Sequence, residues 1–383
     1  MNNRVMIIAG EASGDLHGAR LVTAMQACRP ELSFCGMGGR ELAAVGVEIL
    51  FEAKKIAVVG IAEVFSHLPD ILTARKILRK SLAQERPSLL ILIDFPDFNL
   101  MLAKFAKKLG IPVFYYISPQ VWAWRSGRVK TISQRVDRIG VILPFEEEFF
   151  RSRGVAADYV GHPLLDSVHS STSREEFCRN HGIDPEHICI GLMPGSRKKE
   201  ISSLLPTLLQ AAQRLKERSA KRLVFLLPLA STVTEEEIRS NGLDEFGQGL
   251  DVRLIKEKRH DMMAACDAAV VVSGTVTLEL AILNTPMVVV YKVSPRTYFL
   301  GKLLVNKEIK HFSLVNLIAG KEVVPELLQE EVTPERIDTE LSSILFNSER
   351  REEMLQGLSY VQDCLGKPGA SDKAAQLALS LLH

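Results

Sequence analysis

The run VMIIAGEASGDLHG at residues 5–18 decides the fold of this chain. Its five apolar residues carry no charge, which indicates a strand buried on both faces, and the glycine-containing turn after them opens a stretch with helical spacing. A buried strand, a tight turn and a helix form the first half of a βαβ unit, which builds a parallel sheet. We therefore predict a strand at Val5–Ala9 and a helix at Gly14–Cys28.

The same alternation recurs along the whole chain. Further strands are predicted at Leu89–Ile93, Val113–Ile117, Arg138–Leu143, Cys189–Met193, Leu223–Leu227, Val252–Ile255, Ala268–Val272 and Met287–Tyr291. Further helices are predicted at Asp70–Glu85, Leu100–Leu109, Ile201–Arg218, Arg259–Cys266 and Thr277–Leu283. This pattern is typical of α/β proteins with doubly wound parallel sheets.

The alternation pauses once, in the polar segment Gly161–His181, and we place the domain boundary there. We expect two Rossmann-like domains, 1–165 and 166–347, facing each other across a cleft. The helical tail, 348–383, is expected to pack back on the N-terminal domain. Ligands of such sheets bind beyond the carboxyl ends of the strands, so polar residues directly after strands are the candidates for function.

Length and composition exclude several classes of protein. The 383 residues suffice for two domains, and 47 Lys and Arg against 46 Asp and Glu give no charge bias for nucleic acid. The six cysteines form no CxxC pair and are expected to be reduced thiols. No apolar stretch reaches the roughly 20 residues that span a bilayer, and the first apolar run is too short for a signal peptide. We expect a cytoplasmic protein.

The polar residues after the early strands allow two interpretations each. The turn at Gly10–Gly18 is neither a dinucleotide fingerprint nor a P-loop, and alone it is best explained as a tight turn with Ser13 or Asp15 as helix N-cap. Asp94 follows the buried strand Leu89–Ile93, where desolvation would raise its pKa and suit it to accept a proton from a hydroxyl. Asp97 is assigned mainly to capping the next helix.

Both tryptophans, Trp122 and Trp124, lie in the run SPQVWAWR at 118–125, beside basic residues. Indole faces and arginine suit stacking on a sugar or holding a phosphate. Packing in the core is the competing use for at least one of the two rings.

Two turns in the second half of the chain have the features of phosphate sites. Gly195-Ser196-Arg197 connects a strand to a helix start, where backbone N–H groups, the positive helix end and a guanidinium converge. The turn Ser273-Gly274-Thr275 is similar and is followed by Glu279, a carboxylate suited to a ribose diol. No metal-ligand spacing and no GxSxG motif is present. A nucleotide-sugar enzyme that needs no metal or other cofactor fits best.

A basic amphipathic stretch, Ile61–Leu82, offers a membrane-facing surface with Val64, Phe65, Leu68 and Leu72 among its apolar residues. On the pattern alone, an ordinary core helix with solvated lysines is the favoured interpretation.

Ten motifs then carry a resemblance over essentially the whole chain: GEASGD (10–15), VGIAEV (59–64), IDFPDFN (93–99), SPQVWAWR (118–125), LPFE (143–146), VGHP (160–163), MPGSRKKEI (193–201), SGTVTLE (273–279), NLIAG (316–320) and PELLQEE (325–331). With them the sequence resembles the lipid-A-disaccharide synthases, glycosyltransferase family 19 of the GT-B architecture. That family condenses UDP-2,3-diacylglucosamine with 2,3-diacylglucosamine 1-phosphate (lipid X) to the β-1,6-linked disaccharide and UDP, at the inner leaflet of the inner membrane of Gram-negative bacteria.

The resemblance implies roles for individual residues. Asp94 would be the general base on the acceptor 6-hydroxyl, in a single displacement with inversion. The remaining roles would be UDP binding by Gly195, Ser196, Arg197, Ser273, Gly274, Thr275, Glu279, Asn316 and Gln329, and contacts on the acceptor side by Glu11, Asp97, Trp122 and Trp124. Membrane lipids are expected partners, and a homodimer is compatible with the sequence.

Two alternatives carry less weight. The first is another GT-B enzyme of UDP-GlcNAc, such as the non-hydrolysing 2-epimerase or the transferase that makes peptidoglycan lipid II. The second is a non-catalytic nucleotide-sugar sensor, which would tolerate the loss of Asp94.

Overall fold

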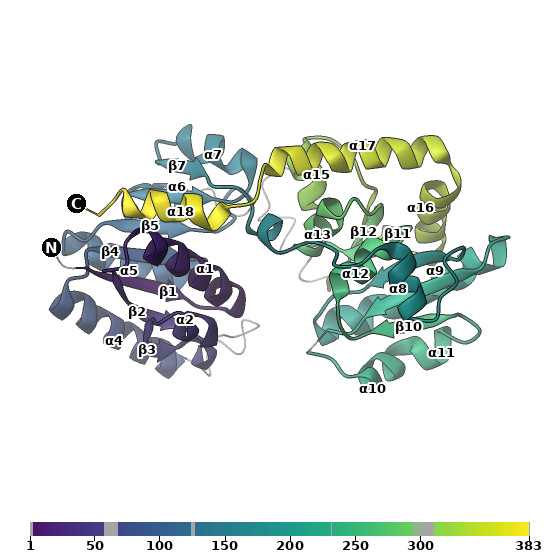
Figure 1. The fold of residues 1–383 in the computed structure, drawn as a ribbon, viewed down its shortest axis with the longest axis horizontal. Helices are drawn as coiled ribbons and strands as arrows, with labels where there is room; N and C mark the ends of the chain where they lie inside the picture. The colour runs from purple at the N-terminus through teal and green to yellow at the C-terminus, as the bar shows by residue number, and fades with distance from the viewer. Residues whose placement is uncertain are drawn as a thin grey trace. The chain divides into compact units, whose positions relative to one another are not determined.

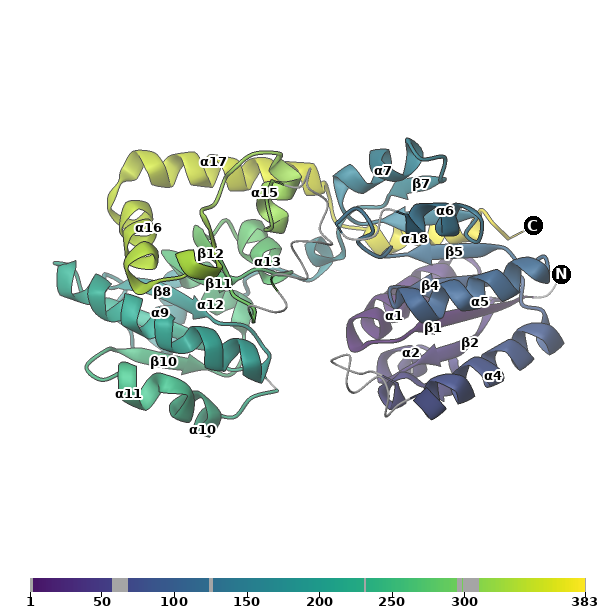
Figure 2. The same cartoon turned by 180° about the vertical axis from the view of Figure 1, so that it is seen from behind.

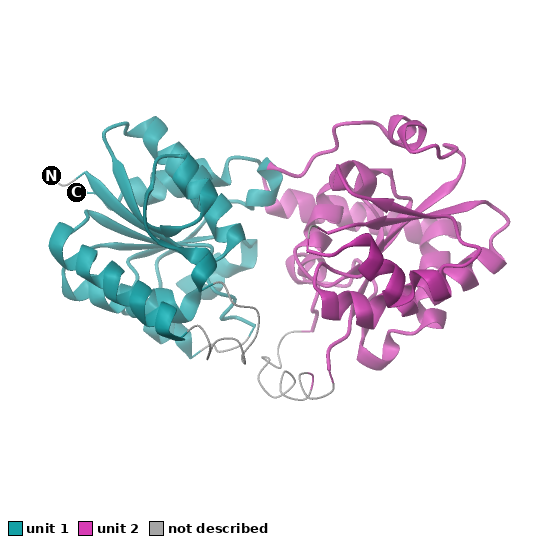
Figure 3. Cartoon of the chain, turned by 90° about the horizontal axis from the view of Figure 1, so that it is seen from below, with its two compact units in different colours: residues 1–166, 367–383 teal, residues 167–366 magenta. Residues whose placement is uncertain are grey.

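The computed structural model describes residues 3–56, 68–123, 127–230, 232–294, 298 and 310–382. The chain divides into two compact units, one of residues 1–166 with 367–383 and one of residues 167–366 (Figure 3). Each unit is an α/β domain built on one parallel sheet, as predicted from the sequence. The divide lies one residue after the predicted boundary.

The first unit holds a sheet of seven parallel strands in the order β3-β2-β1-β4-β5-β6-β7 (Figures 1 and 2). Its strands are β1 (Arg4–Ala9), β2 (Ser33–Gly38), β3 (Glu48–Glu52), β4 (Leu89–Ile93), β5 (Val113–Tyr116), β6 (Arg138–Val141) and β7 (Ala157–Tyr159). The sequence predicted β1, β4, β5 and β6 to within two residues at each end. It missed β2, β3 and β7 because glycines, charged ends or shortness hide their apolar pattern.

Helices cover both faces of this sheet. They are α1 (Ala12–Cys28), α2 (Arg40–Ala44), α4 (Leu68–Glu85), α5 (Pro96–Lys108), α6 (Arg128–Ser133), α7 (Pro144–Arg151) and α18 (Ala370–Leu379), with short turns η1 (Ala53–Lys55) and η2 (Pro163–Asp166). Val5 and Ile7 of β1 pack with α1 and α18, whereas Met6 and Ile8 pack with α4 and α5. Because the strand is buried on both faces, it is apolar throughout rather than alternating.

The second unit has six parallel strands in the order β10-β9-β8-β11-β12-β13. They are β8 (Ile188–Met193), β9 (Leu223–Pro228), β10 (Val252–Ile255), β11 (Ala268–Val272), β12 (Met287–Tyr291) and β13 (Glu326–Leu328). The other elements are α8 (Arg174–Asn180), α9 (Lys198–Arg218), α10 (Glu235–Ile238), η3 (Arg239–Leu243), α11 (Asp244–Phe246), α12 (Arg259–Ala265), α13 (Val276–Ile282), α15 (Leu314–Ala319), η4 (Gln329–Glu331), α16 (Pro334–Phe346) and α17 (Ser348–Leu365).

Both sheets reverse their strand order at the same relative place. In the first unit β1 lies beside β4, with Ala9 paired to Ile93, and in the second β8 lies beside β11, with Met193 paired to Val271. At such a reversal the connections leave in opposite directions, and ligands bind at the carboxyl ends of the two strands. The fold therefore positions the residues that directly follow these four strands.

The tail corrects one prediction, because only its last helix returns to the first unit. Helix α17 buries Met354, Leu358 and Val361 and contacts α13, α15 and α16, so it belongs to the second unit. Helix α18 alone contacts α1. The buried apolar face of α17 packs in the core of the second unit. Within the described ranges, no helix is long and apolar enough to cross a membrane.

Candidate active site

Asp94 occupies a strained turn at the end of β4. Its φ is 43°, that of Phe95 is 47°, and Ile117 at the end of β5 has a φ of 57°. The carbonyl oxygen of Asp94 accepts hydrogen bonds from Tyr115 Oη and Asn99 Nδ2, both at 2.7 Å. Its N–H donates to the carbonyl of Ile117 at 3.3 Å. Left-handed backbone at residues other than glycine is costly and persists only where its surroundings enforce it, as these bonds do.

The environment of Asp94 suits a proton acceptor. Burial raises the pKa of its carboxyl, and the nearby charge of Glu11 raises it further, whereas the Phe95 N–H opposes the shift. Glu11 is the N-cap residue of α1, directly after β1, so the strand reversal brings the two carboxylates together. A carboxylate with a raised pKa binds a proton more strongly and is a better general base near neutral pH.

Gly10, which precedes Glu11, is required by the aromatic ring of Phe95. A Cβ atom at Gly10 would lie 2.4 Å from that ring, far closer than any side chain tolerates. The ring also packs against Phe98, with their centroids 5.5 Å apart. Gly10, the first glycine of GEASGD, therefore permits the close packing of the two turns that carry Glu11 and Asp94.

Asp15 does not cap its own helix, contrary to one of the sequence interpretations. It is buried, and its carboxylate accepts hydrogen bonds from the N–H groups of Gly39, Glu41 and Leu42 at 2.6, 2.9 and 3.3 Å. Asp15 therefore binds the start of α2, and it holds the Gly38-Gly39 turn against α1.

The capping role predicted for Asp97 is also wrong. Phe95 occupies the N-cap position of α5, and Asp97 lies in its first turn, exposed and ion-paired with Arg128 of α6. Because the helix already begins at Pro96, Asp97 lies inside it and does not hold the N-cap position. Asp97 is near Asp94 in sequence, but the structure does not bury it.

Trp122 has the packing role that we considered for one tryptophan. It is buried, its Nε1 donates to Glu146 Oε1 at 3.0 Å, and its ring meets Phe145 edge to face. Burial raises the pKa of Glu146 to about 7, and hydrogen bonds from Leu143 N–H and Trp122 oppose the shift. Trp124 lies outside the described residues, as do Val64 and Phe65.

In the second unit, Glu200 closes the Gly195 turn after β8. Gly195 has a φ of 114°, and a Cβ there would lie 2.3 Å from Glu200 Oε2. Glu200 Oε1 accepts from Arg197 Nη1 at 2.9 Å, which aligns a guanidinium that is 70% exposed. Ser196 is held through its carbonyl by Thr232 Oγ1. Sequence reasoning did not assign Glu200 a role, although its position three residues into the helix is a capping signal.

Ser273 holds the turn after β11, and the backbone N–H groups of the next two residues donate no hydrogen bond to a described residue. Ser273 donates from its N–H to Val290 O at 2.9 Å and from Oγ to Phe312 O at 3.1 Å. Among the described residues, the N–H groups of Gly274 and Thr275 donate no hydrogen bond. Two such amides before a helix can bind an anionic oxygen.

Glu279, on α13, has a side chain that is only 6% exposed and faces two residues of α12. Its Oε1 accepts from Arg259 Nη2 at 2.9 Å, and its Oε2 lies 3.4 Å from His260 Nε2. The sequence prediction included Glu279 and missed both partners, because nothing in the spacing from 259 to 279 indicates that α12 and α13 pack together.

The side-chain amides of Asn316 and Gln329 hold loops in this structure. Asn316 is fully buried, and its side chain exchanges hydrogen bonds with the backbone of Val323 and Val324 at 2.8–3.0 Å. Gln329, with a φ of 56°, pairs both amide atoms with the backbone of Val293 at 2.8 and 3.0 Å. These bonds position the segments after β12 and α15, and the contacts with UDP that the resemblance implies for both residues stay a prediction.

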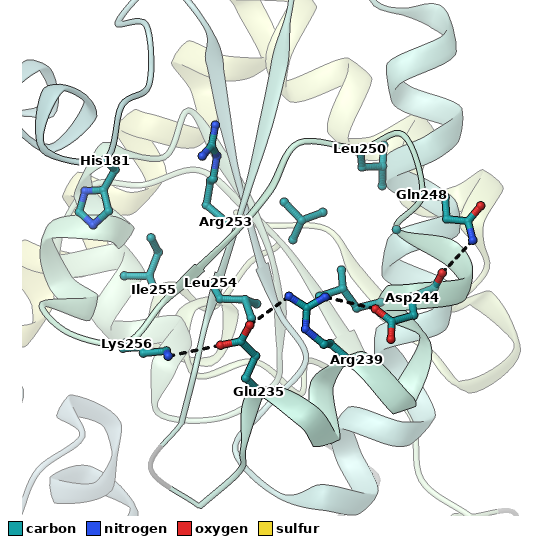
Figure 4. A pocket seen from close by; sticks show the side chains of 13 residues that line it. His181, Glu235, Arg239, Asp244, Gln248, Leu250, Arg253, Leu254, Ile255 and Lys256 are labelled. Atoms are coloured by element: carbon teal, nitrogen blue, oxygen red, sulfur yellow. Dashed lines mark hydrogen bonds and ion pairs between the residues drawn. The ribbon is translucent and has the colours of Figure 1, made fainter.

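A cavity of about 670 Å³ lies elsewhere, beside the edge strand β10 (Figure 4). Four of its charged residues pair with one another, since Glu235 pairs with Arg239 and Lys256, and Arg239 also pairs with Asp244. Two strands separate β10 from the reversal at β11, and none of the predicted residues lines the cavity. In the described part of the chain, no group of three or more His, Cys, Asp or Glu is arranged to hold a metal ion.

Comparison with known proteins places this arrangement in a family. The family model for lipid-A-disaccharide synthetase matches residues 5–380. Relatives called lipid-A-disaccharide synthase include those of Syntrophus aciditrophicus, 50% identical over 100% of this chain and 99% of the relative, and of Myxococcus xanthus, 48% identical over 99% and 97%.

Solved structures that resemble the chain share only its fold. The kitacinnamycin glycosyltransferase has a TM-score of 0.64 at 15% identity, covering 99% of both chains. UDP-GlcNAc 2-epimerase from Neisseria meningitidis, solved with UDP-GlcNAc bound, has a TM-score of 0.63 at 12% identity, covering 98% of both.

Proposed function

This chain belongs to the lipid-A-disaccharide synthase family, and on that premise we propose which of its side chains carry out the transfer. The reaction is the glycosyltransferase step of lipid A biosynthesis. A 2,3-diacylglucosamine unit passes from UDP to the 6-hydroxyl of 2,3-diacylglucosamine 1-phosphate, and UDP leaves. The protein must accept the proton that leaves the attacking hydroxyl, and it must stabilise the negative charge that grows on the departing diphosphate.

Asp94 takes the proton in this proposal. The observation that carries it is the position of Asp94 at the strand reversal of the first unit, in a turn held by Tyr115 and Asn99, with its pKa raised by burial and by Glu11. A base must be held in place and must bind a proton strongly enough, and these contacts meet both needs. Glu11 then belongs to the acceptor side and tunes Asp94.

The second unit binds UDP. Arg197, aligned by Glu200, reaches the diphosphate, while the free amides of Gly274 and Thr275 donate to a phosphate oxygen. Glu279 accepts a hydrogen bond from a ribose hydroxyl. Amide dipoles and a guanidinium stabilise the growing charge on UDP, so the proposed mechanism uses no metal ion and no other cofactor.

We also propose that the protein works at the surface of the inner leaflet. Supporting this, Leu68 and Leu72 of α4 are 47% and 45% exposed, and the basic residues Arg75, Lys76, Arg79 and Lys80 follow on the same helix. Exposed leucines beside cations suit an anionic lipid surface, from which both acylated substrates come. A homodimer is compatible with this proposal.

The experiment is a disaccharide assay on the purified chain with UDP-2,3-diacylglucosamine and lipid X, with and without a chelator of divalent cations. We expect disaccharide and UDP at equal rates in both conditions. Loss of turnover on chelation, restored by Mg²⁺, would contradict the metal-free mechanism.

A variant separates the nucleotide side from the acceptor side. Arg197→Ala should weaken UDP binding about tenfold or more as well as turnover, because a charge-assisted contact to phosphate is lost. Asp363→Asn, an exposed change on α17, is the control and should alter neither. Unchanged UDP affinity in Arg197→Ala would remove Arg197 from the site.

A further inference from the structure

The buried carboxylate of Glu279 is half satisfied. Oε1 is bound by Arg259, but Oε2 has no hydrogen-bond partner among the described residues. His260 Nε2, 3.4 Å away, is also buried and also without a partner there. That separation is within ion-pair distance if His260 is protonated, but it is longer than an ordinary N–H···O hydrogen bond. Unpaired polar atoms of this kind are rare in native interiors and call for an explanation.

Helix α12 is fixed firmly enough to aim both residues. Asp261 is buried and accepts hydrogen bonds from Ser171 N–H at 2.6 Å, Ser171 Oγ at 2.7 Å and Ser170 Oγ at 3.1 Å. At the other end, Thr285 Oγ1 donates to Met263 O at 3.0 Å. Lys258, which begins the helix, has a φ of 51°. Strained backbone of this kind is concentrated at functional sites, and here it sets the direction of the two following side chains.

We propose that His260 is the second contact to the ribose of the nucleotide, beside Glu279, and that Arg259 is a positioning residue that holds Glu279 with one oxygen free. This inference rests on the proposed UDP site and deepens it. A cis-diol carries two hydroxyls about one hydrogen-bond length apart, and the two unpaired atoms offer one partner to each. Glu279 Oε2 accepts from one hydroxyl, and His260 Nε2 bonds to the other.

The charge state of His260 agrees with that role. Burial lowers the pKa of His260 from 6.5; the carboxylate of Glu279 opposes the shift, and Arg259 and His169 add to it. The ring is therefore neutral at pH 7, and one ring nitrogen is free to accept while the other donates. Since Arg259 binds Oε1, the carboxylate cannot rotate away from the diol without losing that ion pair.

The test measures how strongly the protein discriminates between ribose and deoxyribose. UDP, 2′-deoxy-UDP and 3′-deoxy-UDP are titrated into the full chain by calorimetry. In the native protein each missing hydroxyl should weaken binding roughly tenfold, because a buried polar atom is left unpaired. In His260→Ala, UDP should bind about tenfold more weakly, and the penalty for one deoxynucleotide should vanish while the other remains.

Arg259 is tested in the same way. Arg259→Met should weaken UDP binding several-fold and reduce the discrimination at the hydroxyl held by Glu279, whereas Arg259→Lys should restore part of both. Lys256→Met, an exposed change outside the site, is the matched control and should alter neither. Melting curves for every variant identify any that fails to fold, and His260→Gln replaces His260→Ala in that case.

The outcomes separate this inference from the function on which it rests. If His260→Ala weakens all three nucleotides by the same factor, His260 is only structural and the inference is overturned. If Glu279→Ala keeps both deoxyribose penalties, the ribose is not at Glu279 and the proposed UDP site itself is wrong. Loss of discrimination in Glu279→Ala but not in Arg259→Met would overturn the positioning role alone.

Discussion

The strand that Asp94 follows and the turn that holds it together determine the burial, pKa and position of its carboxylate. A carboxylate directly after a fully apolar strand lies at the carboxyl end of the sheet, partly removed from water. Its pKa rises for that reason. The left-handed turn, the two hydrogen bonds to the Asp94 carbonyl and the charge of Glu11 beside it come from the tertiary fold. Together they make this position the candidate base.

Glu11→Gln should move the acidic limb of the pH–rate profile. Glu11 raises the pKa of Asp94, so the native limb should lie above the ordinary aspartate value of about 3.9. Removing that charge lowers the pKa, the base stays ionised to lower pH, and the limb of kcat/KM shifts down. Glu31→Gln, exposed and distant in sequence, is the control. A limb that stays in place would mean that the two carboxylates do not interact.

Glu146 makes a prediction about stability. Its pKa is about 7 in the folded protein and 4.5 when exposed, so the folded state holds a proton that the unfolded state has lost between these values. The free energy of unfolding should therefore fall as pH rises from about 4.5 to 7 and then level off. Denaturant unfolding of Glu146→Gln should lack this part of the fall. An identical slope in both proteins would show that Glu146 is not its source.

Residues whose partners are distant backbone groups were beyond sequence reasoning. Asp15 was a candidate helix cap because of its residue type, and the resemblance alone implied UDP contacts for Asn316 and Gln329. In the structure the side chain of each bonds to backbone N–H or carbonyl groups that the fold brings close. The hydrogen-bond partner of a buried amide or carboxylate is set by tertiary packing, which residue spacing along the chain does not encode.

At the scale of elements, apolar runs predicted the buried strands well and most of the edge strands poorly. Strands β4, β11 and β12 have the predicted bounds, since burial on both faces demands an uninterrupted apolar run. Strand β10 also has the predicted bounds, although it is an edge strand that carries the exposed Arg253. The strands β2, β3, β7 and β13 lie at or near sheet edges or are short, and their sequences carry glycine or charge. The pairing of α12 with α13, on which the ribose proposal depends, was likewise not predicted.

Helix α4 carries the membrane prediction. Its face with Ala74, Leu78 and Leu82 is buried, as the core interpretation requires, while Leu68 and Leu72 stay exposed at its start. The double variant Leu68→Ser, Leu72→Ser should bind vesicles of anionic phospholipid about tenfold less in a sedimentation assay, because two apolar anchors are lost. Phe346→Ser, an exposed apolar residue of α16, serves as the matched control. Equal binding of all three proteins would exclude α4 as the docking surface.

At the scale of the whole molecule, each unit repeats the same plan, and the plan explains where the chemistry lies. The strand reversal places Glu11 with Asp94 in one unit and Arg197 with Ser273–Thr275 in the other. The placement of the candidate base in the first unit and of the candidate UDP contacts in the second could be predicted from the sequence. In each unit these residues follow strands that the apolar pattern revealed. The division of the tail between the two units could not be predicted, because α17 and α18 have similar helical spacing. They differ only in which unit's core they complete.

Truncation after Gly366 tests that split. It removes α18, whose Ala374, Ala375 and Ala378 share a core with Val5 and Ile7 of β1. Losing this cover should destabilise the first unit by several kcal/mol, on the order of 3, by exposing apolar surface. Hydrogen exchange should accelerate at β1 and stay unchanged at β8. Acceleration of both strands alike would contradict the assignment of α18 to the first unit.

The most direct test of the account compares Asp94→Asn with the native protein in two measurements on the same preparation, turnover and UDP affinity. Asparagine keeps the size of the side chain and cannot accept the proton. We expect a loss of about 10²–10⁴ in turnover with UDP affinity unchanged. Turnover within a few-fold of native would contradict the role of Asp94 as the base.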